Sequence, residues 1–244
     1  MEECIRFEHV SKRYGAHTVL DDFNLTVQRG EFLTMIGRSG CGKTTALRLI
    51  NGLLTPDEGA VYVFGKDVAQ SDLIALRRSI GYAIQGVGLF PHMTVEKNIA
   101  YVPSLSRAWP KAEVRERTAH LLEIVGLDST LTGRYPHELS GGQRQRVGIA
   151  RALAGEARIL LMDEPFGAVD EITRRSLQKE LARLHKELGI TVVFVTHDIK
   201  EALLLGSRVL VMAQSRIVQL DTPENICAHP ANEFVRDLIH GPQA

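Results

Sequence analysis

The stretch Gly37-Arg-Ser-Gly-Cys-Gly-Lys-Thr44 has the glycine, lysine and hydroxyl spacing of a phosphate-binding loop. Its glycines let consecutive backbone N–H groups close around phosphate oxygens, and a helix that begins there turns its positive dipole end toward the anion. Lys43 is then placed to bridge the β- and γ-phosphates, the Thr44 hydroxyl to bind Mg²⁺, and Thr45 to contact the α-phosphate. The predicted nucleotide-binding residues are Gly37, Arg38, Ser39, Gly40, Cys41, Gly42, Lys43, Thr44 and Thr45.

The residues on either side of this loop support the motif. The apolar run 31–36 is typical of a short buried strand, and residues 43–53 are typical of a helix that ends at Asn51-Gly52. The alternative is a glycine turn before an ordinary helix. Strand, loop and helix in this order favour the phosphate loop, because the motif requires both flanking elements.

Two acidic residues follow a second apolar run. Residues 159–162 are typical of a buried parallel strand, and Asp163 and Glu164 come directly after it. Phosphate-loop proteins hold Mg²⁺ with an acid at such a strand end, so Asp163 is a candidate metal ligand. Glu164 is placed to orient and deprotonate an attacking water. The alternative is a pair of acids that are only solvated at a strand end.

A histidine ends a third strand pattern. Residues 191–195 predict another buried strand, which leads into Thr196-His197-Asp198. A single histidine is usually structural. In open parallel sheets, however, ligands bind at the carboxyl ends of the strands. We therefore favour a contact between His197 and the γ-phosphate.

A second glycine-rich turn, Leu139-Ser-Gly-Gly-Gln143, precedes a helix predicted over residues 144–153, with Ser140 as its N-cap. A helix N-terminus with a hydroxyl and exposed backbone amides is a second potential anion site. One chain does not need two such sites for one nucleotide. We therefore expect Ser140, Gly141, Gly142 and Gln143 to contact phosphates held by another copy of the chain.

The remaining segments predict an antiparallel β layer from residues 4–30 and 60–64, and an all-helical insert within residues 95–153. Further helices are predicted over residues 172–188, with a core-facing stripe of Leu177, Leu181, Leu184 and Leu188, and over residues 232–239. Tyr14 falls in a turn of the β layer, where its ring could stack on a nucleotide base. It could equally be a half-buried turn tyrosine. Leu89 and Phe90 lie in a glycine-rich loop, and the alternatives for them are burial in the core or a docking surface.

Composition limits the functional classes. Among 244 residues, Lys plus Arg and Asp plus Glu number 29 each, which gives no reason to expect nucleic acid as a partner. No apolar run approaches the ~20 residues that span a bilayer, and the N-terminus lacks the pattern of a signal peptide. We expect a cytoplasmic protein. Its three cysteines lack a CxxC pair, which argues against disulfides and a zinc site.

These motifs resemble, in content and order, those of the ATP-binding cassette (ABC) ATPases, from about Ile5 to His240. The residues that carry the resemblance are Tyr14, 37–45, Gln85, 139–143, 159–164, Asp170 and His197. The resemblance implies an α/β fold with a P-loop NTPase core, an antiparallel β subdomain and an all-helical signature subdomain. It implies one nucleotide-binding domain over 1–244, with the core and β layer at 1–86 and 157–244 and the helical subdomain at about 87–156.

The resemblance also implies roles for the site residues. Tyr14 stacks on adenine, Gln85 contacts Mg²⁺ and senses the transport partner, and Asp170 lies at the interface of an ATP-bound homodimer. Glu164 is the general base, and Lys43 and His197 complete the catalytic set. The run 166–170 departs from the Ser-Ala-Leu-Asp of many members, which we expect to alter interface packing and to leave Asp170 in place.

Within the family, the chain is similar to the peripheral ATPase subunits of importers for glycine betaine, choline or carnitine. The similarity rests on residues 77–85, 88–95 and 172–178. It implies location on the inner face of the membrane, a separate integral-membrane permease contacted through Gln85, Leu89 and Phe90, and an extracytoplasmic substrate-binding protein. The alternatives are import of another small polar solute or an ABC clamp without transport. Because the sequence ends at Ala244, we expect no regulatory module after the cassette.

Overall fold

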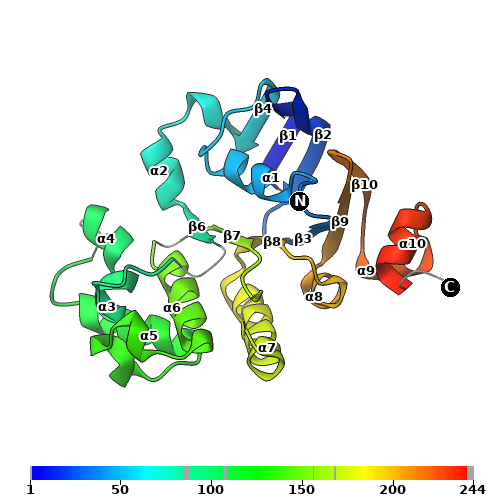
Figure 1. The fold of residues 1–244 in the computed structure, drawn as a ribbon. Coiled ribbons are helices and arrows are strands. Elements are labelled where there is room, and N and C mark those ends of the chain that lie inside the picture. Colours follow the sequence, from blue (N-terminus) through cyan, green and yellow to red (C-terminus); the bar gives the residue numbers. More distant parts are fainter. Residues whose placement is uncertain (1, 85–87, 107–108, 156, 168, 241–244) are drawn as a thin grey trace. The chain divides into compact units, whose positions relative to one another are not determined.

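The computed structural model describes residues 2–84, 88–106, 109–155, 157–167 and 169–240. The chain forms two compact units (Figure 1). Unit 1 comprises Met1–Arg77 and Thr191–Ala244, and unit 2 comprises Arg78–Ile190. Unit 2 is larger than the helical subdomain expected at about 87–156, because two strands and a long helix belong to it as well. The expected division into subdomains stays a prediction.

Unit 1 contains the expected antiparallel β layer. Strand β1 (Glu3–Tyr14) pairs with β2 (His17–Gln28) and with β4 (Glu58–Val63), and the short β5 (Lys66–Asp67) pairs antiparallel with β4. Burial alternates along Phe23–Val27 of β2, as expected for a sheet with one covered face, whereas neighbouring residues are buried at Cys4-Ile5, Val10-Ser11 and Val19-Leu20, in a strand pair whose register shifts at several points. Phe7 and Phe23 meet edge to face inside this layer, with 5.2 Å between their ring centroids.

A second, parallel sheet in unit 1 positions the phosphate loop. Strand β3 (Phe32–Gly37) lies between β8 (Thr191–Val195) and β9 (Arg208–Ala213) and is parallel to both, and β10 (Arg216–Asp221) is antiparallel to β9. Every residue of β3 and β8 is buried, which explains their continuous apolar sequence. Both strands were predicted to within one residue at each end.

The helices of unit 1 cover these sheets. Helix α1 (Lys43–Ile50) lies against β2, β3, β4 and β8 (Figure 1). The sequence pattern also predicted α10 (Glu233–His240) but missed α8 (Ile199–Leu205) and α9 (Pro223–Ala228). Helices α8, α9 and α10 contribute to a core cluster whose buried members are Ile36, Ala202, Val209, Val211, Ile226 and Val235. The remaining short elements are η1 (Val68–Gln70) and α2 (Leu73–Arg78), which runs up to the unit boundary.

Unit 2 joins a parallel strand pair to a group of helices. Strand β6 (Ile80–Ala83) pairs with β7 (Ile159–Asp163). Gly81 lets helix α6 approach β6, because a Cβ atom at Gly81 would lie 2.4 Å from the carbonyl oxygen of Ala152. Helices α3, α5 and α6 pack on one another (Figure 1). The helices are α3 (Val95–Ile99), α4 (Tyr101–Ser106), α5 (Val114–Ile124), α6 (Gly141–Leu153) and α7 (Glu171–Leu188), with short turns η2 (Ser129–Gly133) and η3 (Pro136–Glu138).

Two expectations for the helices of unit 2 were wrong in detail. Helix α6 begins at Gly141, three residues before the predicted start, because the Ser140 cap draws both glycines into its first turn. Along α7, Leu177, Leu181 and Leu184 are buried as predicted, but Leu188 is 46% exposed. The helix ends there and the chain turns away at Gly189, whose φ is +59°.

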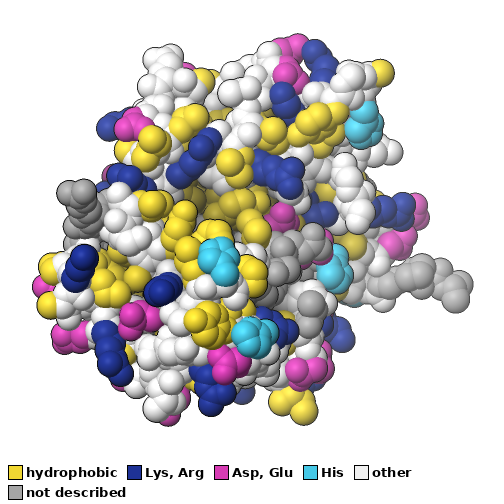
Figure 2. Space-filling model, turned by 60° about the vertical axis from the view of Figure 1, so that its left-hand side comes forward, with side chains coloured by type: hydrophobic (Ala, Val, Ile, Leu, Met, Phe, Trp, Pro, Cys, Tyr) yellow, Lys and Arg dark blue, Asp and Glu magenta, His cyan; other side chains and the backbone are white. Residues whose placement is uncertain are grey.

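The distribution of charged and apolar side chains matches the balanced charge of the sequence. Basic and acidic side chains are mixed over the face drawn in Figure 2. Within the part of the chain that the structure describes, no helix combines the length and the apolar character that crossing a bilayer requires.

An ion pair between the buried carboxylate of Glu31 and the partly exposed Arg208 links the start of β3 to the start of β9. The Glu31 side chain, only 7% exposed, accepts from Nε of Arg208 at 2.7 Å and from its Nη2 at 3.3 Å. Glu31 also accepts from the backbone N–H of Gln28, and Arg208 donates to the carbonyl of Thr26. The pair therefore ties the strand that leads into the phosphate loop to the adjacent turn and strand.

We predict that Glu31→Gln lowers the free energy of unfolding by about 2 kcal/mol, because the partly buried Arg208 guanidinium loses its charged partner and the backbone N–H of Gln28 loses a charged acceptor. Urea unfolding followed by circular dichroism measures the change. The control is Glu187→Gln, whose parent side chain is 53% exposed in an ion pair with Arg183 and should change stability by less than ~0.5 kcal/mol. Equal effects of the two substitutions would contradict the role given to the pair of Glu31 and Arg208.

Candidate nucleotide site

The phosphate loop follows β3 directly and depends on glycine backbone geometry. Gly37, Gly40 and Gly42 have φ values of +151°, +81° and +106°, in a region that other residues rarely adopt. A Cβ atom at Gly37 would lie 2.2 Å from the carbonyl oxygen of Met212, and one at Gly42 would lie 2.5 Å from that of Val19. The loop therefore requires glycine for space as well as for conformation at both positions.

Lys43 reaches back into the loop that precedes it. The residue is only 7% exposed, and its Nζ donates to the carbonyl oxygens of Gly37 at 2.8 Å and Arg38 at 3.1 Å. Its third contact is with Sγ of Cys41 at 3.7 Å. The positive charge is thus held by neutral acceptors within the loop, where a phosphate oxygen would be a stronger partner.

The N-terminus of α1 fits an anion. Its N-cap, Gly42, offers no side-chain hydrogen bond to the first turn, and that turn contains no acidic residue. The first backbone N–H groups of a helix need acceptors, and phosphate oxygens supply them. Thr44 and Thr45 lie in this first turn and are partly buried. A hydroxyl oxygen such as that of Thr44 is also a suitable ligand for Mg²⁺.

A cavity of about 650 Å³ opens beside the phosphate loop. Arg38, Ser39, Gly40 and Cys41 form one wall, and the turn between β9 and β10 forms another. The Arg38 guanidinium lies 5.6 Å from the ring centroid of Phe234 on α10. Loop residues 38–40 are therefore exposed on one side, while Lys43 is enclosed on the other.

Tyr14 is the last residue of β1 and is 49% exposed. Nζ of Lys12 lies 5.9 Å from its ring centroid, and Lys12 itself is tied to Asp57 at 2.8 Å. The ring therefore offers surface for stacking and is also half buried in its turn. Both alternatives raised by the sequence are compatible with this exposure.

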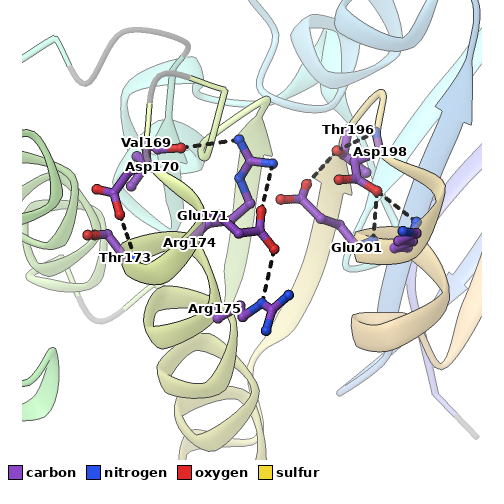
Figure 3. Close-up of polar contacts among 10 residues, drawn as sticks. Val169, Asp170, Glu171, Thr173, Arg174, Arg175, Thr196, Asp198 and Glu201 are labelled. Atoms are coloured by element: carbon purple, nitrogen blue, oxygen red, sulfur yellow. Dashed lines mark hydrogen bonds and ion pairs between the residues drawn. The ribbon is translucent and has the colours of Figure 1, made fainter.

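His197 lies in the short connection between β8 and α8, with an exposed side chain. The residues before and after it are fixed by hydrogen bonds (Figure 3). The Thr196 hydroxyl donates to Oε2 of Glu201 at 2.6 Å and accepts from the backbone N–H of Asp198 at 3.0 Å. Asp198 is the N-cap of α8 and accepts from the backbone N–H groups of Lys200 and Glu201.

In unit 2, the acids predicted at the end of β7 lie in contrasting environments. Asp163 is the last residue of the strand and is 7% exposed. Glu164 is only partly buried, and its φ of +47° is in the left-handed region that side-chain-bearing residues avoid. Such backbone costs free energy and is found disproportionately at active sites, although His9, Asp22, Phe64, Gln214 and Ser215 of this chain also have a positive φ.

The glycine-rich turn at residues 139–143, called the signature turn below, caps α6 with a reciprocal pair of hydrogen bonds. Oγ of Ser140 accepts from the backbone N–H of Gln143 at 3.2 Å, and Oε1 of Gln143 accepts from the backbone N–H of Ser140 at 2.9 Å. The Ser140 hydroxyl hydrogen can still be donated. A Cβ atom at Gly141 would meet nothing closer than 3.9 Å, whereas one at Gly142 would lie 2.4 Å from Cγ2 of Thr173.

Asp170 is the N-cap of α7 and is exposed. Its Oδ1 accepts from the backbone N–H of Thr173 at 3.0 Å (Figure 3). The backbone N–H and the hydroxyl of Thr173 hold the pKa of Asp170 below its ordinary value. Thr173 therefore contacts both the Asp170 cap and the glycine turn at Gly142, so unit 2 brings these two predicted interface elements together.

The predicted coupling residues are partly described. Gln85 lies outside the described residues. Leu89 and Phe90 are both partly buried, and the Phe90 ring lies 4.8 Å from that of Tyr101 and 5.8 Å from the guanidinium carbon of Arg151. The structure therefore makes them neither fully buried core residues nor fully exposed surface residues.

The fully buried Asn98 fixes the loop that carries Phe90 and was missed by the sequence interpretation. Its Oδ1 accepts from the backbone N–H of Phe90 at 2.8 Å, and its Nδ2 donates to the Phe90 carbonyl at 3.1 Å. Nδ2 also donates to the carbonyls of Met93 and Thr94. A polar residue within a helical apolar pattern was the available signal. Thr196 and Glu201, which flank the turn of His197, were missed as well.

Comparisons with known proteins agree with this geometry. The family model described as "ABC transporter" matches residues 20–167. The carnitine transport ATP-binding protein OpuCA of Listeria monocytogenes is 50% identical over 236 residues, which are 96% of this chain and 59% of that protein. The glycine betaine uptake system ATP-binding protein YehX of Escherichia coli is 49% identical, over 96% of this chain and 76% of that protein.

A solved structure gives the same result for the fold. The dimeric post-hydrolysis state of the ATP-binding cassette MJ0796, bound to ADP and phosphate, has a TM-score of 0.81 and 33% identity, over 90% of this chain and 98% of that one. The chain spans about three fifths of the length of the first curated relatives that it matches. Its fold is that of an ABC ATPase domain, and the chain belongs to the ABC transporter family.

Proposed function

We propose that this chain is the ATP-hydrolysing subunit of an ABC importer that takes up a quaternary ammonium osmoprotectant of the glycine betaine, choline and carnitine class. The observation that carries the nucleotide part is the phosphate loop, in which the Lys43 ammonium is held by carbonyl oxygens beside a helix N-terminus without a side-chain cap. The solute class follows the relatives, one of which acts in carnitine transport while another acts in glycine betaine uptake.

Binding of ATP requires the loop to exchange partners. The backbone N–H groups of residues 40–45 would donate to the phosphates, and the Lys43 ammonium would leave the carbonyls of Gly37 and Arg38 for the β- and γ-phosphates. Tyr14 would stack on the adenine with its exposed ring face. Mg²⁺ suits the oxygen atoms of Thr44, Asp163 and Gln85, and when bound it would neutralise charge on the phosphates.

Hydrolysis requires a positioned base and a partner for the γ-phosphate. Glu164 would accept the proton of the attacking water, and its φ of +47° is consistent with a carboxylate held in a required direction. His197 would contact the γ-phosphate from the end of β8. Asp163 at the end of the buried strand β7 would hold Mg²⁺ rather than act as the base.

The signature turn would act on ATP held by a second copy of the chain. The Ser140 hydroxyl keeps a hydrogen to donate, and Gly141 is exposed at the first turn of α6, where a phosphate could approach its backbone. Each ATP would then lie between the phosphate loop of one subunit and residues 140–143 of the other, with Asp170 at the same interface. The ATP-bound state would be a homodimer.

Transport requires a further partner in the membrane. The homodimer would lie on the cytoplasmic face of a permease, and Leu89 and Phe90, beside Gln85 in sequence, would contact it. The Phe90 ring already packs on Tyr101, and Asn98 holds its backbone, so a force on this loop would pass to α3 and α4. An extracytoplasmic substrate-binding protein would deliver the solute.

We predict that Gly37→Ala weakens binding of a fluorescent ATP analogue at least about tenfold, because the new methyl group would displace the loop from Met212. Gly40→Ala should weaken binding less, since a Cβ atom there meets nothing within 4 Å and only the φ of +81° is unfavourable. Gly133→Ala is the control, with ordinary φ and open surroundings. Equal affinities of the Gly37 and Gly133 variants would refute this account of the loop.

The transport proposal predicts that ATPase activity of the chain, copurified with its permease and binding protein in lipid vesicles, rises severalfold when glycine betaine, choline or carnitine is added. The physical reason is that a loaded binding protein stabilises the permease state in which the ATPase dimer closes. The measurement is release of inorganic phosphate with and without each solute.

Glu164→Gln is the matched control for this experiment, because it keeps the side-chain size and removes the base. Both the basal and the stimulated rate should fall at least about a hundredfold. A competent basal rate that no solute changes would discard the osmoprotectant class and keep the ATPase. A parental rate in the Glu164→Gln protein would show that the base is misassigned.

A further inference from the structure

We infer that Thr196 and Glu201 are positioning residues for His197, and that their buried hydrogen bond keeps the histidine in the orientation needed for ATP hydrolysis. The inference rests on the proposed function, because it assumes that His197 contacts the γ-phosphate. It concerns unit 1 alone, in which β8, the turn and α8 all lie.

The Thr196 hydroxyl connects both sides of the turn (Figure 3). It donates to Glu201 at 2.6 Å, a short distance typical of a hydroxyl bound to a carboxylate. The same oxygen accepts from the backbone N–H of Asp198 at 3.0 Å. Because Thr196 precedes His197 and Asp198 follows it, one oxygen atom fixes the backbone on either side of the histidine.

Glu201 lies on α8, so its hydrogen bond with the Thr196 hydroxyl ties the turn to that helix. It is 5% exposed, next to the fully buried Ala202 of α8. The Thr34 hydroxyl of β3 donates to the carbonyl of Ala202 at 3.1 Å. A Cβ atom at Gly206 would lie 2.6 Å from Oγ1 of Thr34, so α8 ends in close contact with β3. The carboxylate is thereby placed relative to the strand that leads into the phosphate loop.

Thr196 is held from the other side by the sheet. It is 2% exposed, and its backbone N–H donates to the carbonyl of Met35 on β3 at 3.2 Å. The bond between Thr196 and Glu201 therefore restrains the backbone on both sides of His197, and the backbone sets the point and the direction from which the exposed side chain of His197 extends.

A buried carboxylate is costly compared with an apolar side chain, and such groups are often retained because they specify a geometry. Here the specified geometry is that of a turn whose histidine should lie near a phosphate. Displacement of a catalytic group by about 1 Å reduces rates by about a hundredfold. The loss should appear in kcat, whereas ATP affinity depends on the phosphate loop and should change little.

The test compares Thr196→Val, which removes the hydroxyl at nearly constant shape, with Thr196→Ser, which restores it. Thr196→Val and Glu201→Leu should each lower kcat for ATP roughly ten- to a hundredfold with KM changed less than about threefold. Thr196→Ser and Glu201→Gln should recover most of the rate. The exposed Lys200 gives a matched control on α8, and Lys200→Ala should keep the parental kcat.

A double-mutant cycle separates positioning from general damage. In a His197→Ala protein, adding Thr196→Val should lower the residual kcat no further, because no histidine is left to position. A second fall of the same size would overturn the inference, as would a parental kcat in both Thr196→Val and Glu201→Leu. If Thr196→Val does not fold, Glu201→Leu carries the same cycle.

Two outcomes would instead concern the proposed function. Absence of ATPase activity in the parental protein would contradict the ATPase proposal. A parental kcat in His197→Ala would contradict the role of the histidine, and the positioning role would fall with it. With an active parent and an impaired His197→Ala protein, only the Thr196 and Glu201 variants decide the inference.

Discussion

The rest of the structure depends on the loop after β3, which places the Lys43 ammonium beside the N-terminus of α1. A triphosphate carries several negative charges. In this loop, the buried Lys43 ammonium and the backbone dipoles at the N-terminus of α1 would attract them. Both depend on the glycines, because a Cβ atom at Gly37 or Gly42 would collide with a neighbouring carbonyl oxygen. The parallel strands, the close approach of β9 and the ion pair of the buried Glu31 with Arg208 hold the strand that leads into that loop.

A common device fixes the other candidate turns. Ser140, Asp170 and Asp198 each use a side-chain oxygen to cap the helix that follows a candidate site turn. Gly42 occupies the same position before α1 and gives no side-chain cap. The contrast has a physical reason in the proposed function, because a bound phosphate would supply the acceptors that the other three helices obtain from their own side chains.

Much of the fold could be predicted because burial leaves a clear pattern. Strands β3, β7 and β8 are continuous apolar runs, and the prediction placed them nearly to the residue. The start of α6 was placed too late because glycines disfavour helix, although the Ser140 cap outweighs that preference. Leu188 follows the helical period of α7 but lies at its end, where periodicity carries no information on burial.

The candidate site was predictable where chemistry depends on local spacing. The phosphate loop and the signature turn are each a single continuous stretch of sequence, so a motif can identify each of them. The contacts that orient them are between distant residues, such as Gly142 with Thr173 or Gly37 with Met212, and no pattern along the chain reveals these. Thr196 and Glu201 were missed for a different reason, since a buried hydroxyl and carboxylate five residues apart look like ordinary polar positions.

The central claim is that two copies of this chain share each ATP through the turn at residues 140–143. The most direct measurement is the mass of the Glu164→Gln protein in solution by light scattering, with and without ATP. The account predicts a change from the 27.0 kDa monomer to twice that mass with ATP, and loss of this change when Ser140→Arg is added. A protein that binds ATP and stays monomeric, or a dimer that Ser140→Arg leaves intact, would contradict it.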